Sequence, residues 1–181
     1  MILRAFLAGR LMPEEIFDVV DEHDRVIGQA PRSVVHAQKL LHRAVHIFVF
    51  NSRGELLLQK RSATKDEYPL CYTSSASGHL SAGETYETAA PRELEEELGL
   101  SGRLEWLSKF SAGPDTSQEH TVLYRTVTDA SPRIDPNEIS AVTFHRLNEI
   151  AGMIDREPHV FSPCFVTLFQ WYQRHLIDAA L

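Results

Sequence analysis

Apolar residues along the chain fall mainly into short runs separated by polar turns. Residues 16–30 contain two such runs around the polar stretch 21–24, which predicts an opening β-hairpin. Two adjacent strands are predicted at residues 45–50 and 55–60, joined by a turn that ends at Gly54. Later apolar runs predict three more strands, at residues 104–110, 121–127 and 141–146.

Two internal segments have the pattern of helices. Residues 34–42 have helix-compatible spacing, and residues 85–98 are rich in Glu, Leu and Ala. Gly99 follows the second segment and suits the left-handed conformation at a helix C-terminus. Pro91 lies inside the same segment, which predicts either a kink or a late start of the regular helix, because proline lacks the N–H for one helical hydrogen bond.

The C-terminal region predicts a further amphipathic helix. Ser162 suits the cap position and Pro163 the first helical position. An apolar stripe follows at Phe165, Leu168, Phe169, Tyr172 and Leu176. Strands and helices therefore form a mixed α/β series without an internal repeat or a linker, and we expect one domain over residues 1–181.

Composition and charge narrow the range of partners. The 181 residues are 43% hydrophobic and 24% charged, which is ordinary for a globular domain, and no apolar run approaches the roughly 18 residues of a membrane span. The formal net charge of −7 argues against a nucleic-acid polymer or an anionic membrane as partner, but not against a small anionic ligand. Only Cys71 and Cys164 are present, and Arg10 interrupts the N-terminal apolar stretch, so we expect a cytoplasmic protein.

The most informative segment is residues 78–100, GHLSAGETYETAAPRELEEELGL. On a helix with about 100° per residue, Glu93, Glu96 and Glu97 share one face. Leu94 and Leu98 share a different, core-directed face. Carboxylates this close repel one another and raise one another's pKa, so their clustering on a partly buried face requires a cation. Ligands that are all oxygens select a hard divalent ion, Mg²⁺ or Mn²⁺.

The residues around the acidic cluster decide between a metal site and an ordinary solvated helix face. A Glu-rich helix by itself is usually a solvated face. Here Gly78 and Gly83 bracket a loop that leads into the helix, and Glu84 stands at a fixed distance from the cluster. Arg92 is placed to hold a carboxylate such as Glu84 or Glu96 and so to fix the ligand geometry. These neighbours favour the metal site.

This segment satisfies the pattern Gly, five residues, Glu, seven residues, Arg-Glu-aliphatic-any-Glu-Glu-any-Gly-aliphatic at every specified position, and it resembles a complete Nudix box. The resemblance implies a mixed sheet sandwiched between helices, with the box as loop, helix and loop. It also implies metal-dependent hydrolysis of a diphosphate linkage in a nucleoside diphosphate derivative or a similar diphosphate. Glu96 and Glu97 are then the leading catalytic and metal-binding candidates, and Glu93 is a further metal ligand.

Beyond the box, the chain resembles the isopentenyl-diphosphate isomerases and the hydrolases similar to them. The matching text is LLHRAVHIFVFNSRGELLLQKRSATKDEYP, SASGH, QEHTVLY and PHVFSP. By this likeness Arg61 and Lys65 contact the diphosphate of a small-molecule substrate, a role that suits a guanidinium and an ammonium group. The alternative for each is an exposed basic residue beside a hairpin.

The same likeness implies a second metal site at His42, His79 and Glu119. His36 is a further candidate for this site, although its spacing from His42 differs by one from the isomerase pattern. Imidazole and carboxylate ligands suit Zn²⁺ or Mn²⁺. Glu119 is also a candidate catalytic carboxylate. Against the site, a lone histidine is more often structural than ligating, and Ser117 stands where the isomerases have a second acid.

Two departures favour a hydrolase over an isomerase. Ser77 stands where the isomerases have their proton-transferring cysteine, and Cys71 is six residues too early to replace it. The isomerases also lack most of the acidic cluster that is complete here. The alternatives are an isopentenyl-diphosphate isomerase and a non-catalytic nucleotide-binding module, which is expected to lose box acids. The box does not specify which group of the substrate leaves, and the oligomeric state is also open. Three aromatic residues are candidates to stack on a base of the substrate: Tyr68, Tyr72 and Phe161.

Overall fold

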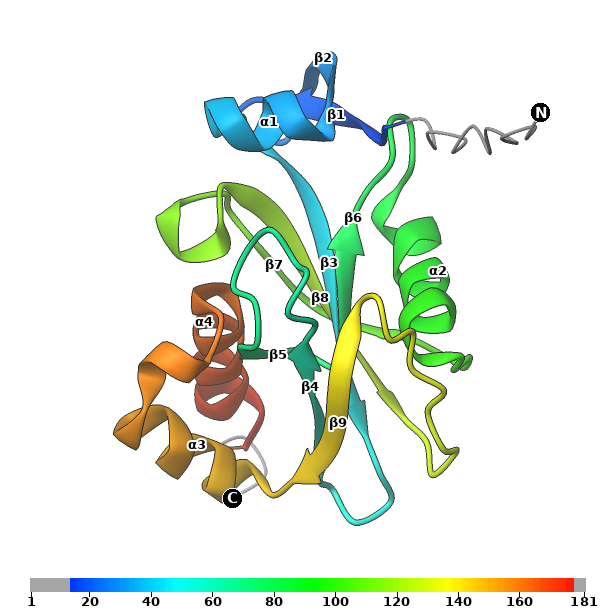
Figure 1. Ribbon diagram of the computed structural model, residues 1–181, viewed down its shortest axis with the longest axis vertical. Coiled ribbons are helices and arrows are strands. Elements are labelled where there is room, and N and C mark those ends of the chain that lie inside the picture. Colours follow the sequence, from blue (N-terminus) through cyan, green and yellow to red (C-terminus); the bar gives the residue numbers. More distant parts are fainter. Residues whose placement is uncertain (1–13, 178–181) are drawn as a thin grey trace, which may run out of the picture.

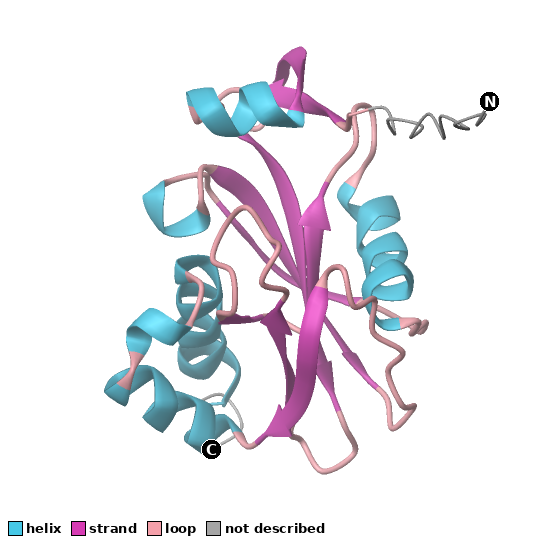
Figure 2. Ribbon diagram, in the orientation of Figure 1, coloured by secondary structure: helices cyan, strands magenta, loops and turns pink. Residues whose placement is uncertain are grey.

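The computed structural model describes residues 14–177. Within this range the strands form a mixed seven-stranded sheet and a separate two-stranded hairpin, and helices cover both faces of the large sheet (Figures 1 and 2). The hairpin pairs β1 (Ile16–Val20) with β2 (Val26–Pro31), as the sequence predicts. Asp21 forms the turn, because its Oδ1 accepts from the backbone N–H groups of His23 and Arg25.

Strand β3 (His42–Phe50) organises the large sheet. It runs parallel to β8 (Glu119–Val127) over its whole length, and β7 (Glu105–Phe110) is antiparallel to β8. On its other side β3 pairs with β6 (Ala76–His79), and its last residue pairs with the first residue of β4 (Leu56–Arg61). Strand β4 also pairs with β5 (Tyr72–Thr73) and β9 (Ile139–His145). The strands predicted at residues 45–50, 55–60, 104–110, 121–127 and 141–146 are thus confirmed.

Alternate residues of β3 face opposite layers of the molecule, because successive side chains of a strand point to opposite faces. Val45, Ile47 and Val49 belong to the core against α2 (Tyr86–Leu98). Phe48 and Phe50 belong to the core against α4 (Pro163–Tyr172) and α3 (Leu147–Arg156). Figure 1 shows α2 on one side of the sheet and α3 and α4 on the other. One strand therefore connects the two layers that carry the candidate site residues.

Helix α2 begins and ends as its sequence predicts. Thr85 and Thr88 form a reciprocal capping box at the start, and Gly99 has a φ of 60° at the end. Leu94 and Leu98 are buried against the sheet. Pro91 neither delays the regular helix nor divides it, since the helix runs from Tyr86 through Leu98.

The predicted C-terminal helix is confirmed by α4. The Ser162 hydroxyl accepts from the backbone N–H of Phe165 at 3.4 Å, and Pro163 is the first helical residue. The buried stripe consists of Phe165, Leu168, Phe169 and Tyr172. The Leu176 side chain and the N-terminal stretch that contains Arg10 lie outside the described part of the chain. A π-helical turn, Gln173–Ile177, continues α4.

Three parts of the fold differ from the sequence predictions. Helix α1 (Arg32–Gln38) ends earlier than expected because Lys39 adopts a left-handed conformation, with φ of 53°, and His42 begins β3. Strands β5 and β6 form in a segment that looks irregular, and helix α3 has no counterpart among the predicted elements. Ser75 helps to hold the polar segment in place, because its hydroxyl donates to the Leu57 carbonyl and accepts from the Val49 N–H.

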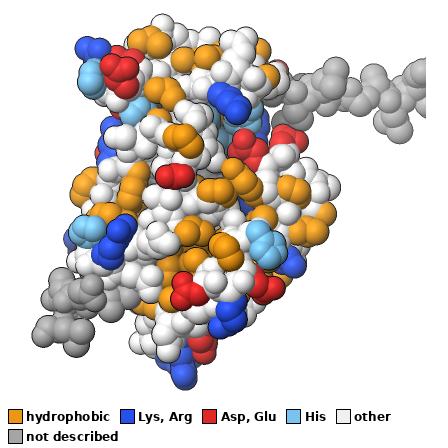
Figure 3. Space-filling view, turned by 90° about the vertical axis from the view of Figure 1, so that its left-hand side faces the viewer, with side chains coloured by type: hydrophobic (Ala, Val, Ile, Leu, Met, Phe, Trp, Pro, Cys, Tyr) orange, Lys and Arg blue, Asp and Glu red, His pale blue; other side chains and the backbone are white. Residues whose placement is uncertain are grey.

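Two short 3₁₀ turns complete the described elements, Pro114–Thr116 and Pro158–Val160. None of the helices within residues 14–177 is both long enough and apolar enough to cross a membrane. On the face shown in Figure 3, acidic and basic side chains are interspersed with apolar ones. The single-domain organisation over residues 1–181 and the cytoplasmic location remain predictions from the sequence.

Candidate functional site

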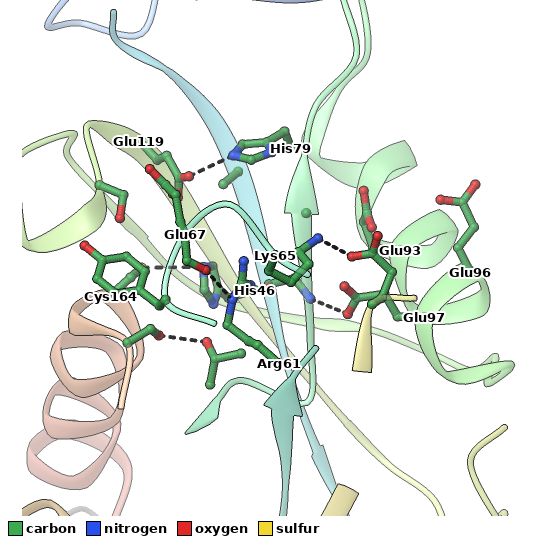
Figure 4. Close-up of a pocket in the computed structure, with 18 of the residues that line it drawn as sticks. His46, Arg61, Lys65, Glu67, His79, Glu93, Glu96, Glu97, Glu119 and Cys164 are labelled. Carbon is green, nitrogen blue, oxygen red and sulfur yellow. Dashed lines mark hydrogen bonds and ion pairs between the residues drawn. The ribbon is translucent and has the colours of Figure 1, made fainter. Parts of the chain in front are cut away.

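A cavity of about 450 Å³ lies between α2, the sheet and the N-terminal end of α4. Figure 4 shows Glu93, Glu96 and Glu97 of α2 on one side of it, with Glu119 and Cys164 on the other. Arg61 and Lys65, at and after the end of β4, also line the cavity. The fold therefore brings the predicted carboxylates and the predicted cations to one place, although they come from segments far apart in the sequence.

The three α2 carboxylates line this cavity but differ in exposure. Glu93 and Glu97 are buried, at 9% and 6% exposed, whereas the Glu96 side chain is 60% exposed. Glu97 Oε2 accepts from the Ser77 backbone N–H and from Gln59 Nε2, both at 3.0 Å. Strands β6 and β4 thus fix Glu97, while Glu96 projects toward solvent at the edge of the cluster.

Arg92 donates hydrogen bonds to three acids of the box, Glu84, Glu93 and Glu96. Its Nε and Nη2 donate to the two carboxylate oxygens of Glu84 at 2.9 and 2.8 Å. Its Nη1 donates to Glu93 at 2.7 Å and to Glu96 at 3.0 Å. Nη2 also donates to the His79 carbonyl at 3.1 Å, which ties the helix to β6. The expected contacts of Arg92 with Glu84 and Glu96 are therefore both present.

Gly78 is explained by its closeness to Glu93. A Cβ atom at this position would collide with the Glu93 carboxylate, so a larger residue would displace that carboxylate from its place beside Arg92. At Gly83, by contrast, a Cβ atom would meet no neighbouring atom, but the backbone φ is 77°, so the requirement for glycine there is conformational.

Burial makes the two inner carboxylates hard to ionise. Burial raises the pKa of Glu93 to about 7, against the opposing effect of Arg92. Burial and the neighbouring Glu93 raise the pKa of Glu97 to about 8. A divalent cation would supply the positive charge that these acids need, and carboxylate oxygens are the ligands that Mg²⁺ and Mn²⁺ prefer. The donor set therefore fits such an ion.

Arg61 and Lys65, the two residues predicted to bind the diphosphate, contact other groups around the cavity. Arg61 Nε donates to the Glu67 backbone carbonyl at 2.9 Å. Lys65 forms an ion pair with Glu138, which also lines the cavity. Arg61 and Lys65 therefore line the same cavity as the α2 carboxylates, where an anionic substrate would need them.

Opposite α2, the histidines singled out from the sequence come together with Glu119. His79 Nε2 lies 2.9 Å and His42 Nε2 3.6 Å from Glu119 Oε1. His36 joins them, and one ring nitrogen from each of the three histidines lies within 4.8 Å of the others. Burial opposes ionisation of Glu119, but the neighbouring imidazoles of His42 and His79, of which His79 is within hydrogen-bond distance, outweigh it and hold the pKa of Glu119 well below its ordinary value. The cluster is thus assembled in space.

Several lining residues do not stand out in the sequence. His46 lies inside the strand predicted from its apolar neighbours, yet it faces the α4 side and touches Cys164. Thr73, Ser162 and Glu67 also line the cavity. The alternation of β3 is a signal that could have found His46, but the approach of α4 is a tertiary contact that no local pattern records. The sequence does single out three further lining residues: Tyr68, Ser77 and Ser117.

The aromatic candidates separate into two groups. Tyr68 lines the cavity and is 38% exposed. Tyr72 and Phe161 pack against each other, with ring centroids 5.7 Å apart, and do not line it. Of the three, Tyr68 is thus the one placed to meet a ligand.

The NUDIX domain family model matches residues 40–163, so the chain belongs to this family. A Photorhabdus laumondii protein named isopentenyl-diphosphate Delta-isomerase 2 is 36% identical over 157 residues, covering 84% of this chain and 89% of that protein. A Nostoc relative named an uncharacterized Nudix hydrolase is 38% identical over 165 residues, covering 91% of this chain and 84% of the relative. The predicted similarity to the isomerase branch of the family is confirmed.

Solved structures confirm the predicted mixed α/β fold. The crystal structure of a Deinococcus radiodurans protein matches with a TM-score of 0.71 and 31% identity, covering 78% of this chain and 90% of that one. The NUDIX domain of a Shewanella oneidensis protein, solved with ADP-ribose, matches with a TM-score of 0.60 and 15% identity, covering 81% and 99%. These likenesses establish the fold around the cavity.

The raised pKa of Glu97 predicts a particular pH dependence of stability in the metal-free protein. A Glu side chain has an ordinary pKa of 4.5, whereas folded Glu97 stays protonated up to about pH 8. The folded state thus binds more protons between these values, so the free energy of unfolding falls as the pH rises. Melting temperatures in chelator, from about pH 5 to about pH 9, should fall more steeply for the unmodified protein than for Glu97→Gln. If the melting temperatures of the two proteins change with pH in parallel, Glu97 does not have a raised pKa in the folded state.

Proposed function

We propose that this protein is a metal-dependent Nudix hydrolase that cleaves a diphosphate linkage in a nucleoside diphosphate derivative or a similar diphosphate. The observation that carries the proposal is the meeting of two buried box carboxylates, Glu93 and Glu97, with the cationic Arg61 and Lys65 around one cavity. Acids and cations that line the same cavity provide for both the ion and the phosphate groups of such a substrate.

Glu93, Glu96 and Glu97 would hold Mg²⁺ or Mn²⁺. When bound, such an ion neutralises phosphate oxygens and lowers the pKa of a coordinated water. The chain itself fixes the ligands: Arg92 orients Glu93 and Glu96, while Gln59 and the Ser77 N–H orient Glu97. In the proposed hydrolysis the oxygen of a water molecule bonds to one phosphorus atom, the bridging P–O bond breaks, and its electron pair leaves with the other phosphate. Glu96, Glu97 or Glu119 would accept the proton of that water, with Glu119 serving a water on its own side of the cavity.

Arg61 and Lys65 bind the diphosphate in this proposal. Lys65 carries its ammonium group on a flexible stem and already faces the carboxylate of Glu138, so an incoming phosphate competes for the same cation. Arg61 is anchored through Nε to Glu67, which leaves its terminal nitrogens to donate to phosphate oxygens. The two residues therefore set the position of the diphosphate relative to α2.

The isomerase named among the relatives is the second candidate, and the assembly of His42, His79 and Glu119 favours it. Ser77 opposes it, because a hydroxyl is a far weaker acid or base than a thiol near neutral pH. Cys71 donates to the His159 carbonyl and is not a lining residue, while burial raises the pKa of the Cys164 thiol and so weakens it as an acid. The complete box favours hydrolysis over both isomerisation and a non-catalytic role.

A screen with Mg²⁺ tests the reaction class. The panel comprises nucleotide sugars, dinucleotides, nucleoside triphosphates, coenzyme A and prenyl diphosphates, with detection of phosphate-containing products. With the substrate found, Glu97→Gln should lower turnover at least about 100-fold, equivalent to about 2.7 kcal/mol of transition-state stabilisation, because it removes a charge and retains the volume. The variant should keep its fold by circular dichroism.

The matched control is Glu95→Gln, on the exposed side of the same helix. Glu95 does not line the cavity, so this variant should retain turnover within about twofold. Unchanged turnover in Glu97→Gln, or no product from any member of the panel, would contradict the proposed function.

Replacing Arg61 and Lys65 together with Ala should weaken substrate binding more than it lowers turnover. The two cations contact the diphosphate in the ground state as well as in the transition state, so their loss raises KM. We expect an increase of at least about 10-fold, measured at saturating Mg²⁺ with the substrate from the screen. Arg103→Ala removes an exposed cation away from the cavity and should leave KM unchanged. Equal KM values in the double variant and the control would show that Arg61 and Lys65 are surface charges only.

A further inference from the structure

A second group of potential metal ligands lies at the wall of the cavity opposite α2. It consists of His46 on β3, Glu119 at the start of β8 and Cys164 in the first turn of α4. One ligand atom from each of these residues lies within 4.8 Å of the others. All three side chains are buried, yet all three line the cavity, so an ion can reach them from solvent.

The distance between His46 and Cys164 fits a zinc site. His46 Nε2 and Cys164 Sγ are 3.5 Å apart. Tetrahedral zinc has Zn–N distances of about 2.0 Å and Zn–S distances of about 2.3 Å, which place the two ligand atoms about 3.5 Å from each other. A neutral thiol–imidazole hydrogen bond also fits this distance, so the distance alone does not indicate a metal site. The evidence for a metal site comes from the third ligand, Glu119, and from the orientation of the imidazole.

A contact with Ser74 can hold His46 in the orientation that a metal ligand needs. Its Nδ1 lies 2.8 Å from the hydroxyl of the fully buried Ser74. With the Nδ1 proton donated to Ser74, Nε2 presents its lone pair to the space shared with Cys164 and Glu119. Histidines that bind metals usually donate their other ring N–H in this way, which fixes both the tautomer and the ring plane.

We propose that His46, Cys164 and Glu119 form a binding site for Zn²⁺, separate from the carboxylates of α2. A thiolate, an imidazole and a carboxylate select a borderline ion such as Zn²⁺, whereas the oxygen ligands on α2 select Mg²⁺ or Mn²⁺. Three protein ligands leave the fourth tetrahedral position open toward the cavity. The thiolate and the carboxylate balance the charge of the ion, which lies on the side of the cavity away from the Nudix box.

Glu119 connects this site to the histidine cluster, since its Oε1 contacts His79 and His42. Cys164 is what distinguishes the two sets of ligands. An ion bound by His36, His42 and His79 has no sulfur ligand, whereas an ion bound at the proposed site has a thiolate ligand. A spectroscopic probe of metal–sulfur bonding therefore separates them.

Cobalt provides that probe, because Co²⁺ replaces Zn²⁺ in sites of this kind and a thiolate ligand gives it a near-ultraviolet charge-transfer band. Metal-free protein, reduced without added thiols, is titrated with Co²⁺. We expect one equivalent to produce the band, an excess of Mg²⁺ to leave it unchanged and one equivalent of Zn²⁺ to abolish it. The readout does not depend on turnover, so it is independent of the proposed hydrolysis.

Two variants identify the thiol. The chain has only two cysteines, so a band that persists in Cys71→Ser must arise from Cys164, even if a Cys164 variant does not fold. Cys164→Ser should abolish the band, and His46→Gln should weaken Co²⁺ binding at least about 10-fold. No band in the unmodified protein at saturating Co²⁺, or a band lost in Cys71→Ser, would overturn the proposal.

Discussion

The arrangement of the acidic side chains in the Nudix box depends on the hydrogen bonds that the guanidinium group of Arg92 donates. One planar group donates to Glu84, Glu93 and Glu96 and to the His79 carbonyl, so the loop, the helix and β6 are fixed relative to one another. Without it, like-charged carboxylates on one helical face would repel one another and turn toward solvent. Its charge is not sufficient for the whole cluster, because Glu97 has no contact with it and is held by Gln59 and the Ser77 N–H. That unbalanced acid is the feature that a divalent cation would stabilise.

Strand β3 extends this arrangement across the molecule. Its odd-numbered core residues pack toward α2, and its even-numbered residues, His46 among them, face α4. The parallel partner β8 begins at Glu119, which therefore lies beside His42 at the same end of the sheet. The carboxylates of α2 thus lie on one side of the cavity, while Glu119 from β8, His46 from β3 and Cys164 from α4 lie on the other. The two metal preferences that we propose follow from this separation.

Local patterns predict the parts of the structure that local interactions determine. The helix period places Glu93 and Glu97 on one face and Gly99 ends α2, so the sequence predicts these features correctly. Strands β5 and β6 contain no apolar run from which they could be predicted. They are held instead by pairing with β3 and β4 and by the hydroxyl of Ser75, which lies between them. The meeting of His46 with Cys164 depends on the docking of α4, across 118 residues of chain, and has no signature in the sequence.

We propose that the cavity hydrolyses diphosphates and does not isomerise them. The most direct measurement follows the unmodified protein with Mg²⁺ in deuterated water by NMR, with isopentenyl diphosphate in one sample and the diphosphate panel in another. We expect release of phosphate or a nucleoside monophosphate from a panel member, no conversion to dimethylallyl diphosphate and no deuterium in the prenyl group. Ser77→Ala should leave hydrolysis largely intact. Isomer exchange in the unmodified protein that disappears in Ser77→Ala would contradict the proposed hydrolysis and identify an isomerase.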